Sequence, residues 1–186
     1  MTKTIYLQAA IAAMVPAIVA LDQECLGGFW SASAYLAEIE RDHSQMLVIS
    51  NQAEILGFVC AWSVLEEAHL IMLVVAPSDR RRGLGKAMVW AILAWARAHG
   101  SEWVTLEVRK SNLQAIRLYQ FFGFGILGER RNYYQNPPED ALILWRKEIQ
   151  TLGFYQALVS WHSHIHGHLR AHQLELVAGV EWLQGF

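Results

Sequence analysis

The sequence predicts a mixed α/β domain in which apolar strands are followed by amphipathic helices. The apolar run LIMLVV at residues 70–75 precedes a helix-spaced apolar pattern that ends near Gly100, and residues 103–109 alternate between apolar and polar positions before a second helical pattern. The chain has 186 residues, of which 54% are hydrophobic and 17% charged, enough for one domain with its own core. We therefore expect a sheet with helices packed on it.

Composition and charge narrow the function classes. The formal net charge is −2, so we expect no direct nucleic-acid partner, because such proteins need a basic face to neutralise phosphates. Apolar runs stay short of the roughly 18 to 20 residues of a membrane span, so no membrane partner is expected. Cys25 and Cys60 form neither a disulfide framework nor a metal spacing. These features predict a cytoplasmic protein.

The first half of the chain alternates strand and helix signals. Residues 4–8 have the pattern of a strand, and Pro16 fits the first turn of a following helix, where backbone amides lack partners. Ser31 is a candidate N-cap for a short helix. Residues 46–49 and 55–62 are predicted to pair as a hairpin that leads into the strand at 70–75.

The loop after this strand has the chemistry of a phosphate site. Gly83 and Gly85 leave no side chain between the first amides of the next helix and an anion, and the helix N-terminus adds about half a positive charge. Full positive charges come from Arg80, Arg81, Arg82 and Lys86. A plain basic turn would carry the same residues, so both interpretations stay open.

Two residues in the second half are candidates for chemistry. Glu107 lies on the polar side of the alternating strand, where a carboxylate is costly unless it has a partner or opens on a cleft. Tyr119 lies on the next helix, which Ser111 or Asn112 would cap. A helical aromatic is more often part of the core. Two further strands follow, with Pro137 and the next proline marking their connection.

Six short motifs occur in an order that matches a known family. They are LVVAP at 73–77, RRRGLG at 80–85, LEVRKSN at 106–112, AIRLY at 115–119, FGF at 122–124 and RNYY at 131–134. Over residues 4–147 the chain resembles the RimI-type ribosomal-protein-alanine N-acetyltransferases of the GCN5-related N-acetyltransferase (GNAT) superfamily. The resemblance implies a mixed, strongly twisted sheet with helices on both faces, whose fourth and fifth strands splay apart around the cofactor.

The resemblance also implies roles for particular residues, with acetyl-CoA as co-substrate and no metal. Backbone groups of the fourth strand would bind the pantetheine arm: Leu73, Val74 and Val75. Amides of the glycine loop would hold the pyrophosphate: Arg81, Arg82, Gly83, Leu84, Gly85 and Lys86. Asn112 matches a cofactor contact, Glu107 the general base and Tyr119 the general acid. An N-cap role would explain Asn112 equally well.

The implied reaction is acetylation of the N-terminal α-amino group of a protein, the N-terminal alanine of a small-subunit ribosomal protein in the characterised family members. Acetylation of another amine is the alternative: a lysine side chain, a polyamine or another small molecule. A CoA-binding regulatory module without turnover is a third. Ala76 and the pair Phe29 and Trp30 depart from the family pattern and bear on the peptide groove. Phe29 and Trp30 could equally cover the core. The oligomeric state is not predicted.

Residues 148–186 follow the predicted acetyltransferase domain at 1–147. We expect a helical extension that buries its leucines and tryptophans, Trp161 and Trp182 among them, on the domain or on a second copy. Weak points or breaks are expected at glycines, namely Gly153, Gly167 and Gly179. Five histidines mark the segment: His162, His164, His166, His168 and His172. Pairs among them have a metal-capable spacing, but no carboxylate or cysteine set accompanies them, so no metal site is predicted.

Overall fold

The structure, a computed structural model, describes residues 2–180 and 183. Its elements in chain order are β1 (Lys3–Ala9), η1 (Ala12–Met14), α1 (Val15–Leu26), α2 (Ala32–Ile39), β2 (Ser44–Ser50), β3 (Ile55–Val64), β4 (Glu67–Val75), η2 (Pro77–Asp79), α3 (Leu84–Ala98), β5 (Trp103–Arg109), α4 (Leu113–Phe121), β6 (Gly125–Gln135), β7 (Pro138–Arg146), α5 (Leu152–Ala171) and β8 (Leu174–Ala178).

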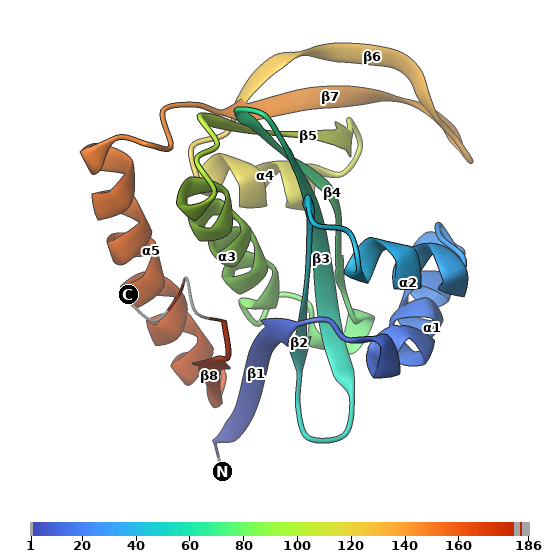
Figure 1. Cartoon of the computed structure of the whole chain (residues 1–186), viewed down its shortest axis with the longest axis vertical. Helices are drawn as coiled ribbons and strands as arrows, with labels where there is room; N and C mark the ends of the chain where they lie inside the picture. The colour runs from blue at the N-terminus through green and yellow to red at the C-terminus, as the bar shows by residue number, and fades with distance from the viewer. Residues whose placement is uncertain (1, 181–182, 184–186) are drawn as a thin grey trace.

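One mixed sheet organises the molecule, with the strand order β6-β7-β5-β4-β3-β2-β1-β8 (Figure 1). The pairs β4–β5 and β1–β8 are parallel and the other pairs antiparallel. One core joins α3, α4 and α5 to one face of the sheet, and a second core joins α1 and α2 to the other face. The predicted mixed sheet with helices on both faces is confirmed.

The local signals in the sequence explain several helix ends. Pro16 lies in the first turn of α1, as predicted. Ser31 caps α2 and accepts a hydrogen bond from the Ala34 amide at 3.2 Å. After α3, Gly100 takes the left-handed conformation with φ of 80°, which glycine adopts without the cost that a β-carbon would add. The predicted helices and strands are therefore present, with ends shifted by a few residues.

The central parallel pair separates partway along. β4 and β5 pair only from Glu67 with Trp103 to Leu70 with Leu106, although both strands continue beyond these residues. Just past this point Ile71 is an extra residue in β4, because Cys60 pairs with Met72 and Ala61 with Leu70. A β-bulge of this kind bends a strand and re-aims its side chains. Beyond the separation, the facing edges of β4 and β5 are no longer paired with each other.

The C-terminal segment adds a helix and a strand. α5 begins at Leu152, next to Gly153, and continues through Gly167, so a break at Gly167 is wrong. The packing of α5 on α3 stabilises the helix; for example, the indole nitrogen of Trp90 donates to the Leu158 carbonyl at 3.0 Å. β8 was not predicted; it pairs with β1, and Gly179 follows it.

The division of the chain at residue 147 stays a prediction, although α5 shares a core with α3. Trp182 lies outside the described residues, whereas Trp161 is partly buried against this core. Cys25 and Cys60 are free thiols, and Cys60 is buried. Among the described residues, no helix combines the length and the apolar character that crossing a membrane requires.

Candidate active site

Glu107 lies where the central strands part. It directly follows Leu106, the last β5 residue that pairs with β4, and its side chain is only 7% exposed. Val104, Leu106 and Val108 are buried in the core on the opposite face, as the alternation predicted. The cost of the buried carboxylate is offset by partners: Arg130 Nη1 lies 3.1 Å from Oε1.

His69 is the second partner of Glu107 and was not predicted as a site residue. Its Nε2 lies 2.6 Å from Oε2 of Glu107, and the ring is partly exposed. This hydrogen bond is the main cause that holds the pKa of the Glu107 carboxyl below its usual value; burial opposes it, and Arg130 assists. His69 aligns with Thr105 across the parallel strands, which places its ring diagonal to Glu107. Only the pairing register reveals this contact.

Tyr119 is enclosed on the other side of β5. It is 5% exposed and packs edge to face against Phe124, with ring centroids 5.7 Å apart. Burial raises the pKa of the Tyr119 hydroxyl, and the nearby Tyr134 adds to the rise. The hydroxyl of Tyr134 in turn donates to the Glu107 carbonyl at 3.4 Å. Tyr134 therefore links the surroundings of the two predicted catalytic residues.

The glycine loop presents unpaired amides. In the part of the chain that the structure describes, the backbone amides of residues 81–86 donate no hydrogen bond to another protein group. Gly83 is the N-cap of α3 with φ of 99°, and Gly85 lies in the first turn of that helix. The basic side chains of the loop differ in their partners. Arg82 forms an ion pair with Asp79, and Arg80 donates a hydrogen bond to the Val75 carbonyl at 3.1 Å. The amides and a subset of the charges thus remain for an anion.

The free edge of β4 lies next to this loop. Ala76 donates its amide hydrogen to the Leu56 carbonyl at the end of β3. Because successive residues of a strand direct their backbone groups to opposite sides, Leu73 and Val75 direct theirs away from β3, toward the gap left by β5. Val74 directs its groups toward β3. Leu73 therefore offers its backbone groups in the gap, and Val75 offers its amide, because the Val75 carbonyl already accepts from Arg80.

Asn112 serves as the N-cap of α4. Its side-chain oxygen accepts a hydrogen bond from the Ala115 amide at 3.1 Å. The structural role that the sequence allowed is therefore present. Its predicted contact with the cofactor stays a prediction.

Aromatic side chains connect the loop between α1 and α2 to the Glu107 side of the sheet. The rings of Phe29 and Trp30 lie 5.9 Å apart, and Trp30 stacks on Trp62 at 6.5 Å. Trp30 packs against the second core, whereas Phe29 is 59% exposed. Trp62 and His69 line one pocket. The core interpretation holds for Trp30, and Phe29 stays available to a ligand.

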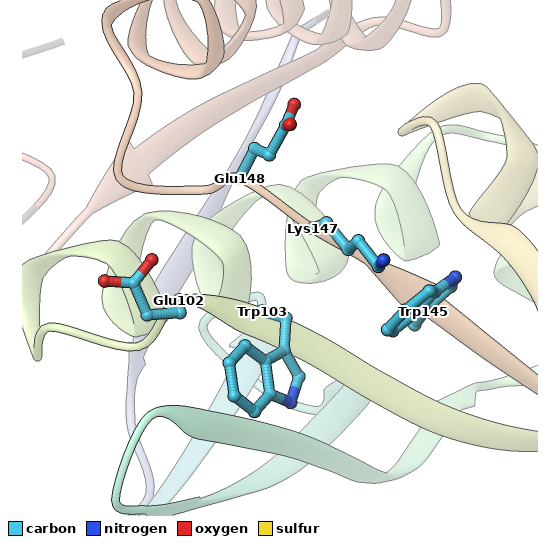
Figure 2. A pocket seen from close by; sticks show the side chains of 5 residues that line it. All are labelled: Glu102, Trp103, Trp145, Lys147 and Glu148. Atoms are coloured by element: carbon cyan, nitrogen blue, oxygen red, sulfur yellow. The ribbon is translucent and has the colours of Figure 1, made fainter.

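A second pocket, of about 320 Å³, lies at the start of β5 (Figure 2). Its lining residues are Glu102, Trp103, Trp145, Lys147 and Glu148. The Lys147 ammonium lies 3.5 Å from the centre of the Trp145 ring. Trp103 lines both pockets and shares the face of β5 that carries Glu107, because the two residues are an even number apart.

Metal-ligating side chains do not gather in this region. Within residues 2–180 and 183, no group of three or more histidine, cysteine, aspartate or glutamate side chains has the arrangement of a metal site. The histidines of α5 contact one another in pairs: the rings of His162 and His166 lie 4.2 Å apart and those of His168 and His172 4.8 Å apart.

The fold and this arrangement define an acyl-transfer enzyme, and sequence comparison agrees: residues 15–124 match the model of the Acetyltransferase (GNAT) family. The chain belongs to that family and is an acetyl-CoA-dependent N-acetyltransferase. It is 31% identical over 132 residues to the [ribosomal protein bS18]-alanine N-acetyltransferase of Escherichia coli (strain K12), covering 70% of this chain and 88% of that relative.

Solved structures give the same result. The ribosomal-protein-S18-alanine N-acetyltransferase from Escherichia coli superposes with a TM-score of 0.70 and 27% identity, covering 77% of this chain and 94% of that one. Ard1 from Thermoplasma volcanium has a TM-score of 0.70 and 25% identity, covering 77% and 97%. The predicted family and enzyme class are confirmed.

Proposed function

We propose that this enzyme transfers the acetyl group of acetyl-CoA to the N-terminal α-amino group of a protein, and that the N-terminal alanine of ribosomal protein bS18 is its substrate. The observation that carries the proposal is the position of Glu107, a nearly buried carboxylate where β4 and β5 separate. The names of the similar proteins from E. coli support the particular substrate. Ribosomal proteins are made in the cytoplasm, so the proposal includes that location.

The residues around the gap suit acetyl-CoA. The backbone groups of Leu73 and the backbone amide of Val75 match the amides of the pantetheine arm, and the unpaired amides of residues 81–86 match the pyrophosphate. Bound there, the thioester supplies the acetyl group. The proton transfers of the reaction are assigned to two side chains of this protein, Glu107 and Tyr119.

Glu107 accepts the proton of the substrate ammonium group, directly or through a water. Its lowered pKa keeps it ionised at neutral pH but makes it a weak base. An α-amino group has a pKa of about 7.7 to 8.0 and a lysine side chain about 10.4, so the α-amine reaches its neutral form at a cost about 3 kcal/mol smaller. A weak base therefore favours an N-terminal substrate over lysine.

Tyr119 donates its phenolic proton to the departing sulfur. Its raised pKa keeps the hydroxyl protonated throughout the working pH range, which suits a donor and excludes a role as base. The two proton-transfer groups lie on different faces of β5, because Glu107 faces away from the core that contains Tyr119. Amine and thioester thus approach from opposite sides of the gap.

The peptide is assigned to the face that carries Glu107. The aromatic contacts from Trp30 to Trp62 and the pocket shared by Trp62 and His69 lie on this side. Phe29 stands exposed at the edge of that surface. Flat aromatic surfaces suit an extended peptide that presents only its first residue to the carboxylate.

Acetyl-CoA turnover on a set of peptides tests the proposal. The peptides differ only at residue one, and a blocked lysine-containing peptide and free polyamines are assayed alongside. We expect the highest kcat/KM for a free N-terminal alanine, with the bS18 sequence as the reference peptide. Activity confined to polyamines or to the blocked lysine peptide would reject the N-terminal substrate while leaving the enzyme class intact.

A further inference from the structure

The C-terminal helix reaches the glycine loop. α5 lies beyond residues 15–124, which match the family model, and its first turns pack Phe154 and Leu158 into the core with α3. Figure 1 shows α5 alongside α3. The C-terminal end of α5 approaches Gly83. A β-carbon added to this glycine would lie 2.9 Å from Cδ2 of His168 and 3.2 Å from Cδ2 of Leu169. The end of α5 is therefore in contact with the loop.

Two histidines of α5 face this loop. His164 and His168 are four residues apart and share one side of the helix. Nε2 of His164 lies 3.5 Å from Nζ of Lys86, and the His168 ring lies against Gly83 of the loop. His164 is exposed and His168 partly so. Both imidazoles can therefore meet a ligand bound at the loop.

Two positive side chains at this loop have no counter-ion among the residues that the structure describes. Within the described residues, Arg81 and Lys86 have no carboxylate at ion-pair distance, whereas Arg82 has Asp79. Lys86 instead lies 4.0 Å from the centre of the Phe121 ring. Uncompensated cationic groups beside unpaired amides create a positive potential that suits an anion.

The surroundings of His168 add a second argument. Burial is the largest cause that lowers the pKa of the His168 ring. His172, Lys86 and His164 lower this pKa further, and the Arg81 backbone opposes them. Every charged neighbour of the ring in this group is cationic or can become so. A bound anion is the partner that would favour the protonated ring.

We propose that His164 and His168 of α5, together with Lys86, bind phosphate groups of acetyl-CoA, so that the C-terminal extension completes the cofactor site. The inference rests on the acetyl-CoA site placed at residues 81–86. The glycine loop supplies backbone amides on one side of the phosphates, and α5 supplies imidazoles on the other.

Isothermal titration of the full chain with CoA tests this proposal. The variants are His164→Gln, His168→Gln and the double variant, with His166→Gln as the matched control, because His166 lies on the same helix and contacts His162 instead. We expect the double variant to weaken CoA binding by about 10-fold and the control to stay within about 2-fold, as expected for one or two hydrogen bonds to a ligand. Without ligand, all melting temperatures should match the wild type.

A parallel titration with 3′-dephospho-CoA identifies the phosphate. If the loss in the double variant disappears with this ligand, the histidines bind the 3′-phosphate; if it persists, they bind the pyrophosphate. Unchanged or tighter CoA binding by the double variant would overturn the proposal. If the double variant does not fold, the exposed His164→Gln carries the same test alone.

Turnover over a range of acetyl-CoA concentrations separates this proposal from the proposed substrate. The histidine variants should raise the KM for acetyl-CoA in proportion to their loss of CoA affinity, whereas the control His166→Gln should acetylate the preferred peptide at the wild-type rate. If the wild-type protein binds CoA with the expected histidine dependence but acetylates no free N-terminus, the substrate assignment fails and the phosphate assignment stands.

Discussion

His69 on β4 and Glu107 on β5 form a hydrogen bond of 2.6 Å beside the point where their strands separate. The imidazole donates to the carboxylate, because an ionised carboxylate only accepts. The contact fixes the orientation of Glu107 and lowers its pKa. The proposed base is thus held by its neighbour at the gap.

Replacing His69 with alanine should raise the pKa of Glu107, since the largest lowering cause is removed. In the wild type, the pKa of Glu107 is lower in the folded state than in the unfolded state. The ionised carboxylate therefore stabilises the fold at pH values above the unfolded pKa. This contribution is lost as the pH falls through the folded pKa. In His69→Ala the folded and unfolded pKa values lie closer together, so the contribution should be smaller and its loss should be complete at a higher pH. A ¹³C NMR titration of the glutamate carboxyls measures the shift directly.

The same variant should lower kcat by about 10- to 100-fold, because a base that is no longer held in place is misaligned. His43→Ala is the control, since His43 is an exposed histidine before β2. An unchanged carboxyl titration together with wild-type kcat would show that the hydrogen bond has no part in catalysis.

Glu107→Gln should lower turnover by about 10² to 10⁴ at neutral pH, because the amide keeps the shape but cannot accept the proton. Raising the pH should recover part of the loss, with the gain levelling off above the pKa of the substrate amine, about 8. Steady-state kinetics from pH 6.5 to 9.5 follow this recovery. A pH-independent deficit would mean that Glu107 serves only to hold Arg130 and His69.

Arg81 and Arg82 are neighbours that should differ in their effect on the cofactor. Arg82 is neutralised by Asp79, whereas Arg81 is exposed and has no such partner among the described residues. Arg81→Gln should weaken CoA binding by about 5-fold, the upper end for an exposed ion pair, and Arg82→Gln by less. The difference should shrink in high salt, which screens exposed charges. Equal losses in both variants would contradict the assignment.

The local parts of the site were predictable because short-range rules govern them. Alternation placed Glu107 opposite the buried face of β5, and the RxxGxG spacing located the unpaired amides ahead of α3. Asn112 was expected at the start of α4 and is its N-cap. Each of these features depends on residues within about two turns or one strand, where propensity and spacing carry the information.

The long-range parts were not predictable from one sequence. The contact between His69 and Glu107 depends on the register of two parallel strands joined through α3. β8 pairs with β1 from the opposite end of the chain, and α5 buries its apolar face on α3, which stabilises a helix that contains Gly167 in its interior. Non-local packing outweighs the weak helix propensity of glycine at this position.

Tyr119→Phe tests the proposed acid. The hydroxyl is removed while the ring and its contact with Phe124 are kept, so the fold should be preserved. We expect turnover to fall by about 10²-fold and the deficit to persist across pH 6.5 to 9.5, because alkaline solution does nothing to protonate a departing thiolate. Tyr35→Phe, which removes a hydroxyl buried in the second core, controls for the loss of a buried polar group. Steady-state kinetics with saturating peptide compare the two variants. Turnover of Tyr119→Phe equal to that of Tyr35→Phe would leave Tyr119 with a packing role alone.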